Sequence, residues 1–264
     1  MSPISVIICG NSHLSSVVQG LKDRKGEVSA ETIPVIHRVF NTIKYGIDYQ
    51  FTIDAGGGHL VPNPHLDKLI DEEIPSEHRR AYVSMFGGNA HNALTLLEMD
   101  EPFDVILPSE PDLPRLPGRR LIPYDAVRAF IEYQARFHIM NTSVMSQRKD
   151  GPLFHIESPP PIGDNHYVSL HLENYFKDQG DRPITPPLLR YKLWRVHSQI
   201  VREACEAYGV TFIPAPDEGM LDGKWLRPEG YSGDSTHAGE WYGRLICQQI
   251  EERLGGHYGG WLWL

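Results

Sequence analysis

Hydrophobic residues along the chain gather in short runs, each bounded by glycine, proline or polar residues. These runs are rich in β-branched and other apolar side chains, and they predict buried strands at residues 4–9, 49–54, 81–86, 153–157 and 210–213. Apolar residues recur at helical spacing over 124–140 and 188–208, which predicts two long helices. Alternating strands and helices indicate parallel strands joined by right-handed crossovers, so the pattern favours an α/β fold.

A serine lies where the first predicted strand gives way to a helix. Ser12 follows the apolar run that ends at Cys9 and Gly10. In open parallel sheets, ligands bind beyond the carboxyl ends of the strands, where a helix N-terminus presents unpaired N–H groups to an anion. Ser12 is therefore well placed to act on a ligand. Its alternative role is to cap the helix, which is the commoner use of serine at such a position.

An aspartate and a histidine three residues apart supply what a nucleophilic serine needs. A serine hydroxyl is a weak nucleophile until a base accepts its proton, and a third group must orient that base. In Asp234-Ser235-Thr236-His237, one loop can present both side chains to the same point. His237 would then be the base and Asp234 its partner. The competing role for Asp234 is again a helix cap.

Glycine also follows the second and third predicted strands. Residues 56–58 are three consecutive glycines, and Gly87-Gly88-Asn89 follows the third strand. Glycine permits positive φ and a close approach of backbone to ligand, so both loops are suited to direct N–H donors at a substrate. Asn89 adds a side-chain amide, and donors of these kinds form an oxyanion hole. The plainer alternative is that the glycines only form tight turns.

Taken in order, these blocks resemble the SGNH (GDSL-type) hydrolases. Gly10-Asn11-Ser12 is similar to the Gly-Asp-Ser block of that family, and residues 56–58 loosely match its glycine block. Gly87-Gly88-Asn89 is similar to Gly-x-Asn-Asp, and residues 234–237 match Asp-x-x-His fully. Asparagine and alanine, at positions 11 and 90, replace two aspartates of the family. The resemblance implies a three-layer α/β/α fold with a flavodoxin-like, mostly five-stranded parallel sheet, and a helix over 239–253.

The resemblance also implies roles for individual residues. Ser12 would be the nucleophile, His237 the general base and Asp234 the residue that orients it. An oxyanion hole would be built from three groups: the N–H of Ser12, the N–H of one glycine among Gly56, Gly57 and Gly58, and the side chain of Asn89.

Composition narrows the class of protein. With 264 residues, 41% of them hydrophobic, the chain is long enough for one sizeable core, so we expect a single domain over 1–264 with irregular insertions near 101–123 and 162–187. The net charge of −9 argues against a nucleic-acid partner, which needs clustered lysine and arginine. Three widely spaced cysteines indicate buried thiols rather than disulfides. Since no leader or membrane-spanning run is evident, we expect a cytoplasmic protein with no membrane partner.

The 13 histidines raise the question of a metal ion. His13, His59 and His91 all follow the glycine-bearing loops, and three imidazoles can bind zinc. No HxxH or HExxH spacing supports such a centre, so we expect no metal and no other cofactor. We expect His13 and His91 to line the substrate pocket or to bond to neighbouring backbone.

Together these features predict a serine hydrolase that cleaves a carboxylic ester with a short acyl group, such as acetyl, through an acyl-enzyme on Ser12. The substrate would be a small-molecule or carbohydrate ester. Tyr167, Tyr175 and Phe176 in the 162–187 insertion are candidate walls of its pocket, or else they pack locally on a solvent-facing loop. Two alternatives stay open: an O-acyltransferase acting on a carbohydrate or small alcohol, and a catalytically inactive binding protein of the same fold.

Overall fold

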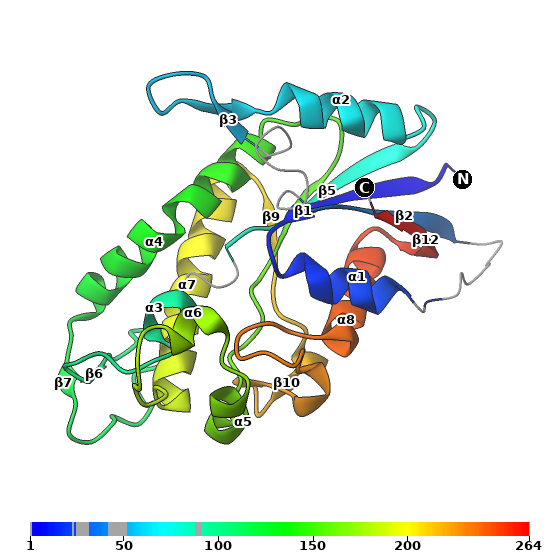
Figure 1. Ribbon diagram of the computed structural model, residues 1–264. Coiled ribbons are helices and arrows are strands. Elements are labelled where there is room, and N and C mark those ends of the chain that lie inside the picture. Colours follow the sequence, from blue (N-terminus) through cyan, green and yellow to red (C-terminus); the bar gives the residue numbers. More distant parts are fainter. Residues whose placement is uncertain (1, 23, 25–31, 42–51, 88–90, 264) are drawn as a thin grey trace.

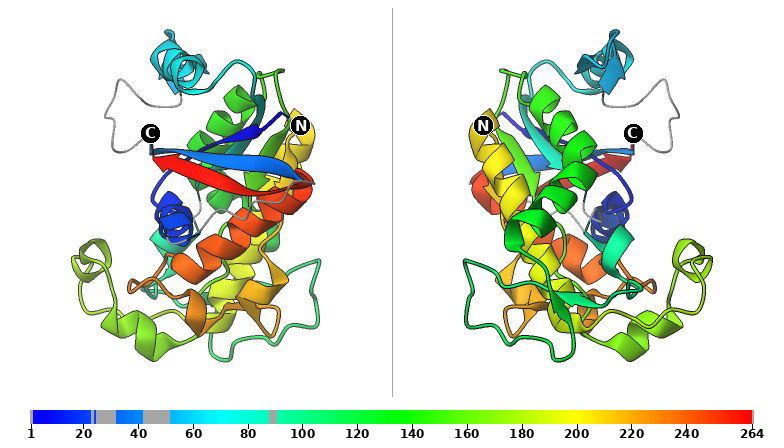
Figure 2. Two further views of the ribbon diagram at one scale, coloured as in Figure 1. Left: turned by 90° about the vertical axis from the view of Figure 1, so that its right-hand side faces the viewer. Right: turned by 90° about the vertical axis from the view of Figure 1, so that its left-hand side faces the viewer.

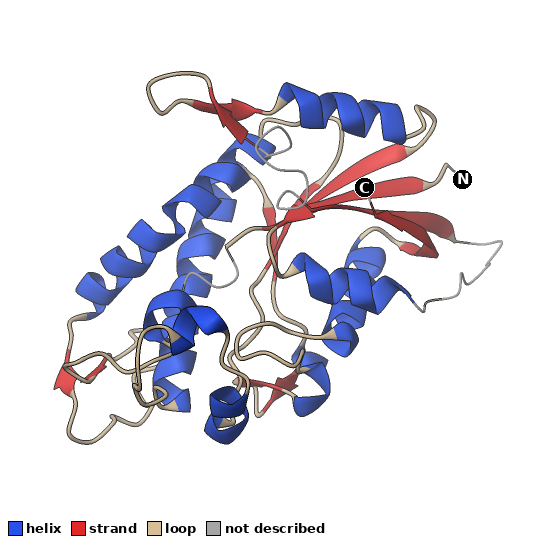
Figure 3. Cartoon of the chain, in the orientation of Figure 1, coloured by secondary structure: helices blue, strands red, loops and turns tan. Residues whose placement is uncertain are grey.

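Six parallel strands form the central sheet of the protein, and helices cover both of its faces (Figures 1 and 3). The computed structural model describes residues 2–22, 24, 32–41, 52–87 and 91–263. The strands of the central sheet are β1 (Ile4–Gly10), β2 (Ile33–Asn41), β5 (Arg79–Met85), β8 (Leu153–Ile156), β9 (Thr211–Ile213) and β12 (Gly256–Trp263). Their order is β12-β2-β1-β5-β8-β9, and each neighbouring pair is parallel. Without β12 this is the flavodoxin-like order, so the predicted fold class is confirmed, with one strand more than expected.

The helices form a layer on each face of the sheet (Figure 2). They are α1 (Leu14–Lys22), α2 (Pro64–Glu73), α3 (Asn92–Thr95), α4 (Tyr124–Met145), α5 (Asn165–Leu170), α6 (Asn174–Lys177), α7 (Pro187–Tyr208) and α8 (Glu240–Arg253). Successive residues of a strand point to opposite faces of its sheet. In β1, Val6 and Ile8 therefore pack with α1 and α8, while Ile7 and Cys9 pack with α2, α4 and α7. Among the helices described, none is long and apolar enough to cross a membrane.

Three pairs of short strands lie outside the central sheet in the described chain. They are β3 (Thr52–Asp54) with β4 (Leu60–Pro62), β6 (Phe103–Asp104) with β7 (Arg120–Leu121), and β10 (Met220–Leu221) with β11 (Trp225–Leu226). The predicted insertion at 101–123 contains β6 and β7. It is tied to α7 by a buried ion pair, in which Lys192 Nζ lies 2.7 Å from Asp104 Oδ1. The insertion at 162–187 contains α5 and α6.

The strand predicted at residues 49–54 does not belong to the central sheet. Residues 52–54 form β3, which pairs with β4 as an antiparallel hairpin instead of joining the central sheet. Residues 49–51, also predicted as strand, lie outside the described residues. The second strand of the central sheet is β2, which the hydrophobic pattern did not predict. The C-terminal segment, for which no element was expected, pairs with β2 as the edge strand β12.

Two glycines bring α1 and α8 into backbone contact. A Cβ atom on Gly243 of α8 would lie 1.9 Å from the carbonyl oxygen of Ser16, and one on Gly20 of α1 would lie 2.6 Å from the backbone nitrogen of Arg244. No side chain fits at such distances, so the helices pack this closely only because both residues are glycine. α1 begins two residues after Ser12 and α8 begins three residues after His237. The helix contact therefore fixes the relative position of the two segments that carry the candidate catalytic residues.

Gly243→Ala is expected to destabilise the protein by about 2–3 kcal/mol, because the added methyl group must push the helices apart. The same displacement should lengthen the contact between Ser12 and His237 and so lower ester turnover. Urea denaturation and a turnover assay measure the two effects. Gln248→Ala, on the exposed face of α8, is the matched control and should change neither quantity. Wild-type stability of Gly243→Ala would show that the helix contact does not hold the site together.

Candidate active site

Ser12 lies in the turn between β1 and α1, with its side chain exposed. The turn is closed by the N–H of Leu14, which donates to the Asn11 carbonyl at 3.0 Å, and by the N–H of Ser15, which donates to the Ser12 carbonyl at 3.1 Å. Gly10 lets β1 approach β5 at this point, since a Cβ atom there would lie 2.8 Å from Met85. The serine is therefore held at the carboxyl end of a central strand, as predicted from the sequence.

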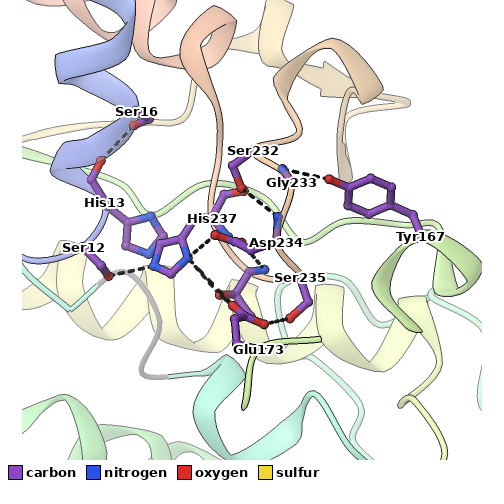
Figure 4. Close-up of polar contacts among 11 residues, drawn as sticks. Ser12, His13, Ser16, Tyr167, Glu173, Ser232, Gly233, Asp234, Ser235 and His237 are labelled. Atoms are coloured by element: carbon purple, nitrogen blue, oxygen red, sulfur yellow. Dashed lines mark hydrogen bonds and ion pairs between the residues drawn. The ribbon is translucent and has the colours of Figure 1, made fainter. Parts of the chain in front are cut away.

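His237 connects Ser12 to Asp234 (Figure 4). Its Nε2 atom is 2.7 Å from Ser12 Oγ, and its Nδ1 atom is 2.9 Å from Asp234 Oδ2. An ionised carboxylate can only accept a hydrogen bond, so Nδ1 carries the proton and donates it to Asp234. Nε2 is then the lone-pair nitrogen and accepts the hydrogen bond of the Ser12 hydroxyl. This is the geometry that a serine nucleophile and its general base require.

Asp234 is held as an anion. Its Oδ1 atom accepts the backbone N–H groups of Thr236 at 2.9 Å and of His237 at 2.7 Å, while Oδ2 accepts the His237 ring. Burial alone would raise the pKa of Asp234, but the hydrogen bonds from His237 and Thr236 hold that pKa well below the usual range of a carboxyl group. Asp234 therefore stays charged at neutral and mildly acidic pH.

The loop that carries Asp234 and His237 is closed upon itself and tied to the 162–187 insertion. The N–H of Gly239 donates to the Gly230 carbonyl at 2.7 Å, and Ser232 Oγ donates to the His237 carbonyl at 2.9 Å. From the insertion, the Tyr167 hydroxyl accepts the N–H of Gly233 at 3.0 Å. These bonds restrict the position of the histidine ring relative to Ser12.

Glu173 was not identified from the sequence, yet it lies against the same loop. It directly precedes α6 in the 162–187 insertion, and its carboxylate accepts the hydroxyl of Ser235 and, at 2.8 Å, the hydroxyl of Thr236. Its Oε1 atom is 3.9 Å from His237 Nδ1. Glu173, Asp234 and His237 form the one cluster of three side chains in the described residues that is close enough to hold a metal ion. No sequence motif marks Glu173.

The two histidines predicted to line a pocket are both buried. The His13 ring is 3% exposed, and its centroid lies 4.7 Å from that of His237. His91 is 1% exposed, and its ring packs against His197 with centroids 5.1 Å apart. Burial, with the neighbouring histidines, lowers the pKa of His91 well below its usual value, so this ring is neutral. Substrate binding by either residue stays a prediction.

The glycines predicted as oxyanion donors do not follow a strand of the central sheet. Gly57 and Gly58 lie in the exposed turn of the β3–β4 hairpin. This hairpin lies on the face of the sheet opposite α1 (Figures 1 and 2). The N–H of Gly58 donates there to the Asp54 carboxylate at 3.2 Å. The glycine block was thus wrongly placed at the exit of a central strand, and we leave Gly57 and Gly58 out of the proposed oxyanion hole. Asn89 lies outside the described residues.

The three aromatic residues predicted to form pocket walls have different surroundings. Tyr167 contacts the histidine-bearing loop through Gly233, and its ring packs against Tyr231. Phe176 is part of the hydrophobic core, whereas Tyr175 is 59% exposed. Of the three, Tyr167 is the one that an observed contact ties to the candidate site.

Solved structures that this chain resembles include proteins described as a lipase and as an aryl esterase. One, provisionally described as a platelet activating factor from Streptococcus pneumonia, is 13% identical; the match covers 96% of this chain and 85% of that one, with a TM-score of 0.46. A GDSL-like lipase from Bacteroides thetaiotaomicron is 14% identical over 94% of this chain and 88% of that one, with a TM-score of 0.37. The aryl esterase of M. Smegmatis is 12% identical over 95% and 98%, with a TM-score of 0.40. No protein-family model and no curated protein matches the chain.

Proposed function

We propose that the protein is a serine hydrolase of the SGNH type, which cleaves a carboxylic ester through an acyl-enzyme on Ser12. The observation that carries the proposal is the continuous chain of contacts from Ser12 Oγ to His237 Nε2 at 2.7 Å, and from His237 Nδ1 to Asp234 Oδ2 at 2.9 Å. A serine that only caps a helix has no need of a histidine whose tautomer is fixed by a carboxylate.

In the first half of the reaction, Ser12 Oγ forms a bond to the carbonyl carbon of the ester while its proton passes to His237 Nε2. The carbonyl electron pair moves to the oxygen, and a tetrahedral intermediate results. The C–O bond to the alcohol then breaks, and the proton on Nε2 goes to the departing alcohol oxygen. Throughout, Asp234 stabilises the imidazolium without accepting its proton. The product is an ester between the acyl group and Ser12.

The second half repeats these steps with water. His237 Nε2 accepts a proton from a water molecule as the water oxygen attacks the acyl carbon. The bond to Ser12 Oγ then breaks, the serine regains its proton from Nε2, and the carboxylic acid leaves. We propose the N–H of Ser12, just before the amino end of α1, as one oxyanion donor and the Asn89 side chain as a second, since donors of this kind stabilise the charge that develops in both halves.

The proposal is tested with p-nitrophenyl esters of increasing acyl length. We expect wild type to hydrolyse the acetyl ester faster than the octanoyl ester, and Ser12→Ala to reduce the rate to background with an unchanged circular dichroism spectrum. Excess acceptor alcohol tests the fate of the acyl group: a hydrolase forms free acid, whereas an O-acyltransferase forms the new ester in preference. Equal hydrolysis by wild type and Ser12→Ala would refute the assignment of the nucleophile.

A further inference from the structure

The Glu173 carboxylate contacts three of the four residues in the Asp234–His237 segment, namely Ser235, Thr236 and His237 (Figure 4). Oε2 accepts the hydroxyl of Ser235, and Oε1 accepts the hydroxyl of Thr236 at 2.8 Å. The same Thr236 oxygen is 3.3 Å from His237 Nδ1. Both carboxylate oxygens thus accept hydrogen bonds from the loop. The hydroxyl group of Thr236 lies between one of them and the histidine ring.

Among the described residues, negative charge predominates around His237. The titratable and charged groups of that part of the chain seen to face its ring are Asp234 on its own loop, Glu173 at the start of α6, and His13 from the β1–α1 turn. Asp234 and Glu173 are both carboxylates, at 2.9 and 3.9 Å from His237 Nδ1. A charge of the opposite sign within about 4–6 Å favours the charged form of a titratable group. The imidazolium that His237 becomes when it accepts the Ser12 proton is therefore stabilised from two sides.

The position of Glu173 in the chain matters as much as its charge. Asp234 belongs to the Asp-x-x-His segment, but Glu173 belongs to the 162–187 insertion, which reaches the site through the contacts of Tyr167 and Glu173 with the loop. The side chain of Glu173 is 29% exposed, so solvent weakens its field at His237 without removing it.

On this geometry we propose that Glu173 is a positioning residue of the active site: it fixes the Asp234–His237 loop through Ser235 and Thr236, and it stabilises the positive charge that His237 gains during the attack of Ser12. The inference rests on the proposed function. Glu173 forms no bond to the substrate and accepts no proton. The proton still moves from Ser12 Oγ to His237 Nε2 and on to the leaving alcohol.

The test is Glu173→Gln, which removes the charge and keeps the shape. The amide oxygen still accepts one of the two hydroxyl groups, and the other hydroxyl can turn to accept from the amide NH₂. We expect a wild-type melting temperature and an unchanged KM for p-nitrophenyl acetate. We expect kcat/KM at neutral pH to fall about fivefold to tenfold, because the imidazolium loses one of its two stabilising charges. With KM and the melting temperature unchanged, the loss falls on kcat alone, which separates a lost charge from a displaced loop.

Two control variants separate the charge from the hydrogen bonds. Asp178→Asn removes an exposed carboxylate from the other end of α6, and it should leave kcat and KM unchanged. Thr236→Val removes one hydrogen-bond donor but keeps both carboxylates, so it should lower the melting temperature, which Glu173→Gln leaves unchanged.

Three outcomes would overturn the inference. With active wild type, an unchanged kcat in Glu173→Gln would leave Glu173 with a structural role alone. Loss of wild-type activity on treatment with a chelator, restored by a divalent cation, would show instead that the Glu173, Asp234 and His237 cluster holds a metal. Wild type that hydrolyses no ester would overturn the proposed function, and this inference with it; that result is seen before any Glu173 variant is made.

Discussion

His237→Ala is expected to lower kcat for ester hydrolysis by about 10⁴-fold or more while the protein stays folded. Without the imidazole, no group within hydrogen-bond reach of Ser12 in the described site can take its proton. The side chain is 18% exposed, so its truncation leaves a partly buried gap, and the melting temperature is measured beside kcat for that reason. The measurement is kcat with p-nitrophenyl acetate, with circular dichroism and melting temperature as evidence of folding.

The partner variant Asp234→Asn should cost about 10⁴-fold and less than His237→Ala, because its amide NH₂ would face His237 Nδ1 and favour the tautomer whose Nε2 carries the proton. The amide oxygen can still accept the backbone N–H groups of Thr236 and His237, which the Asp234 carboxylate binds in the native protein. A His237→Ala variant that keeps more than a tenth of wild-type kcat would exclude His237 as the general base. A cost for Asp234→Asn above that for His237→Ala would contradict the roles assigned to the two residues.

Acidification from pH 7.5 to 5.5 is expected to lower the free energy of unfolding by about 4 kcal/mol. His91, His155 and His197 are all buried, at 1%, 3% and 3% exposed. Burial and the neighbouring histidines lower the pKa of His155 to about 3 and that of His197 to about 4, and they lower the pKa of His91 well below its usual value. In the folded protein these rings therefore stay neutral at pH 5.5.

The sign of the effect follows from proton binding. Below about pH 6.5 the unfolded chain binds a proton at each of the three histidines, whereas the folded chain does not. The contribution of these rings to the free energy of unfolding is therefore fully present above about pH 7. It is lost as pH falls through the histidine pKa of the unfolded chain toward the lower pKa values of the folded protein. Each ring contributes about 1.4 kcal/mol between pH 7.5 and 5.5.

Urea denaturation at the two pH values measures this loss. His197→Asn should reduce the difference between the two pH values by about a third, while the exposed His59→Gln should leave it unchanged. Because each variant is compared with itself at the two pH values, a lower overall stability of His197→Asn does not affect the result. Equal stability of wild type at pH 7.5 and 5.5 would show that the three rings are not kept neutral by burial.

The strands that the sequence predicted correctly are those whose burial is visible in their own residues. β1 is apolar on both faces, and the sheet buries it on both. β2 was missed because Pro34 and two polar residues, His37 and Arg38, interrupt its apolar run. Both polar residues are buried, and their partners are distant: His37 Nε2 lies 2.8 Å from Glu251 of α8, and Arg38 Nε donates to Ser5 of β1 at 3.2 Å. No local pattern shows that such partners exist.

The contacts among Ser12, His237 and Asp234 were predictable because each residue carries a short local signal at the end of an element. The remainder of the site depends on contacts between segments far apart in the sequence. Glu173 meets Thr236, 63 residues away, through a hydroxyl group that no motif marks. Gly20 and Gly243 appear in the sequence only as weak helix formers, and their function is visible once α1 and α8 touch. The three glycines at 56–58 were wrongly predicted to follow a central strand, because a hairpin turn and a ligand-binding loop both use the positive φ that glycine permits.

Covalent labelling with a fluorophosphonate tests the central claim, that Ser12 is a nucleophile activated by His237, most directly. Peptide mass spectrometry of labelled wild type should show one phosphonyl adduct, on Ser12. Ser12→Ala should take up no label, and His237→Ala should be labelled far more slowly than wild type at the same pH. A folded wild type that takes up no label, or a Ser12→Ala variant labelled as fast as wild type, would contradict the account.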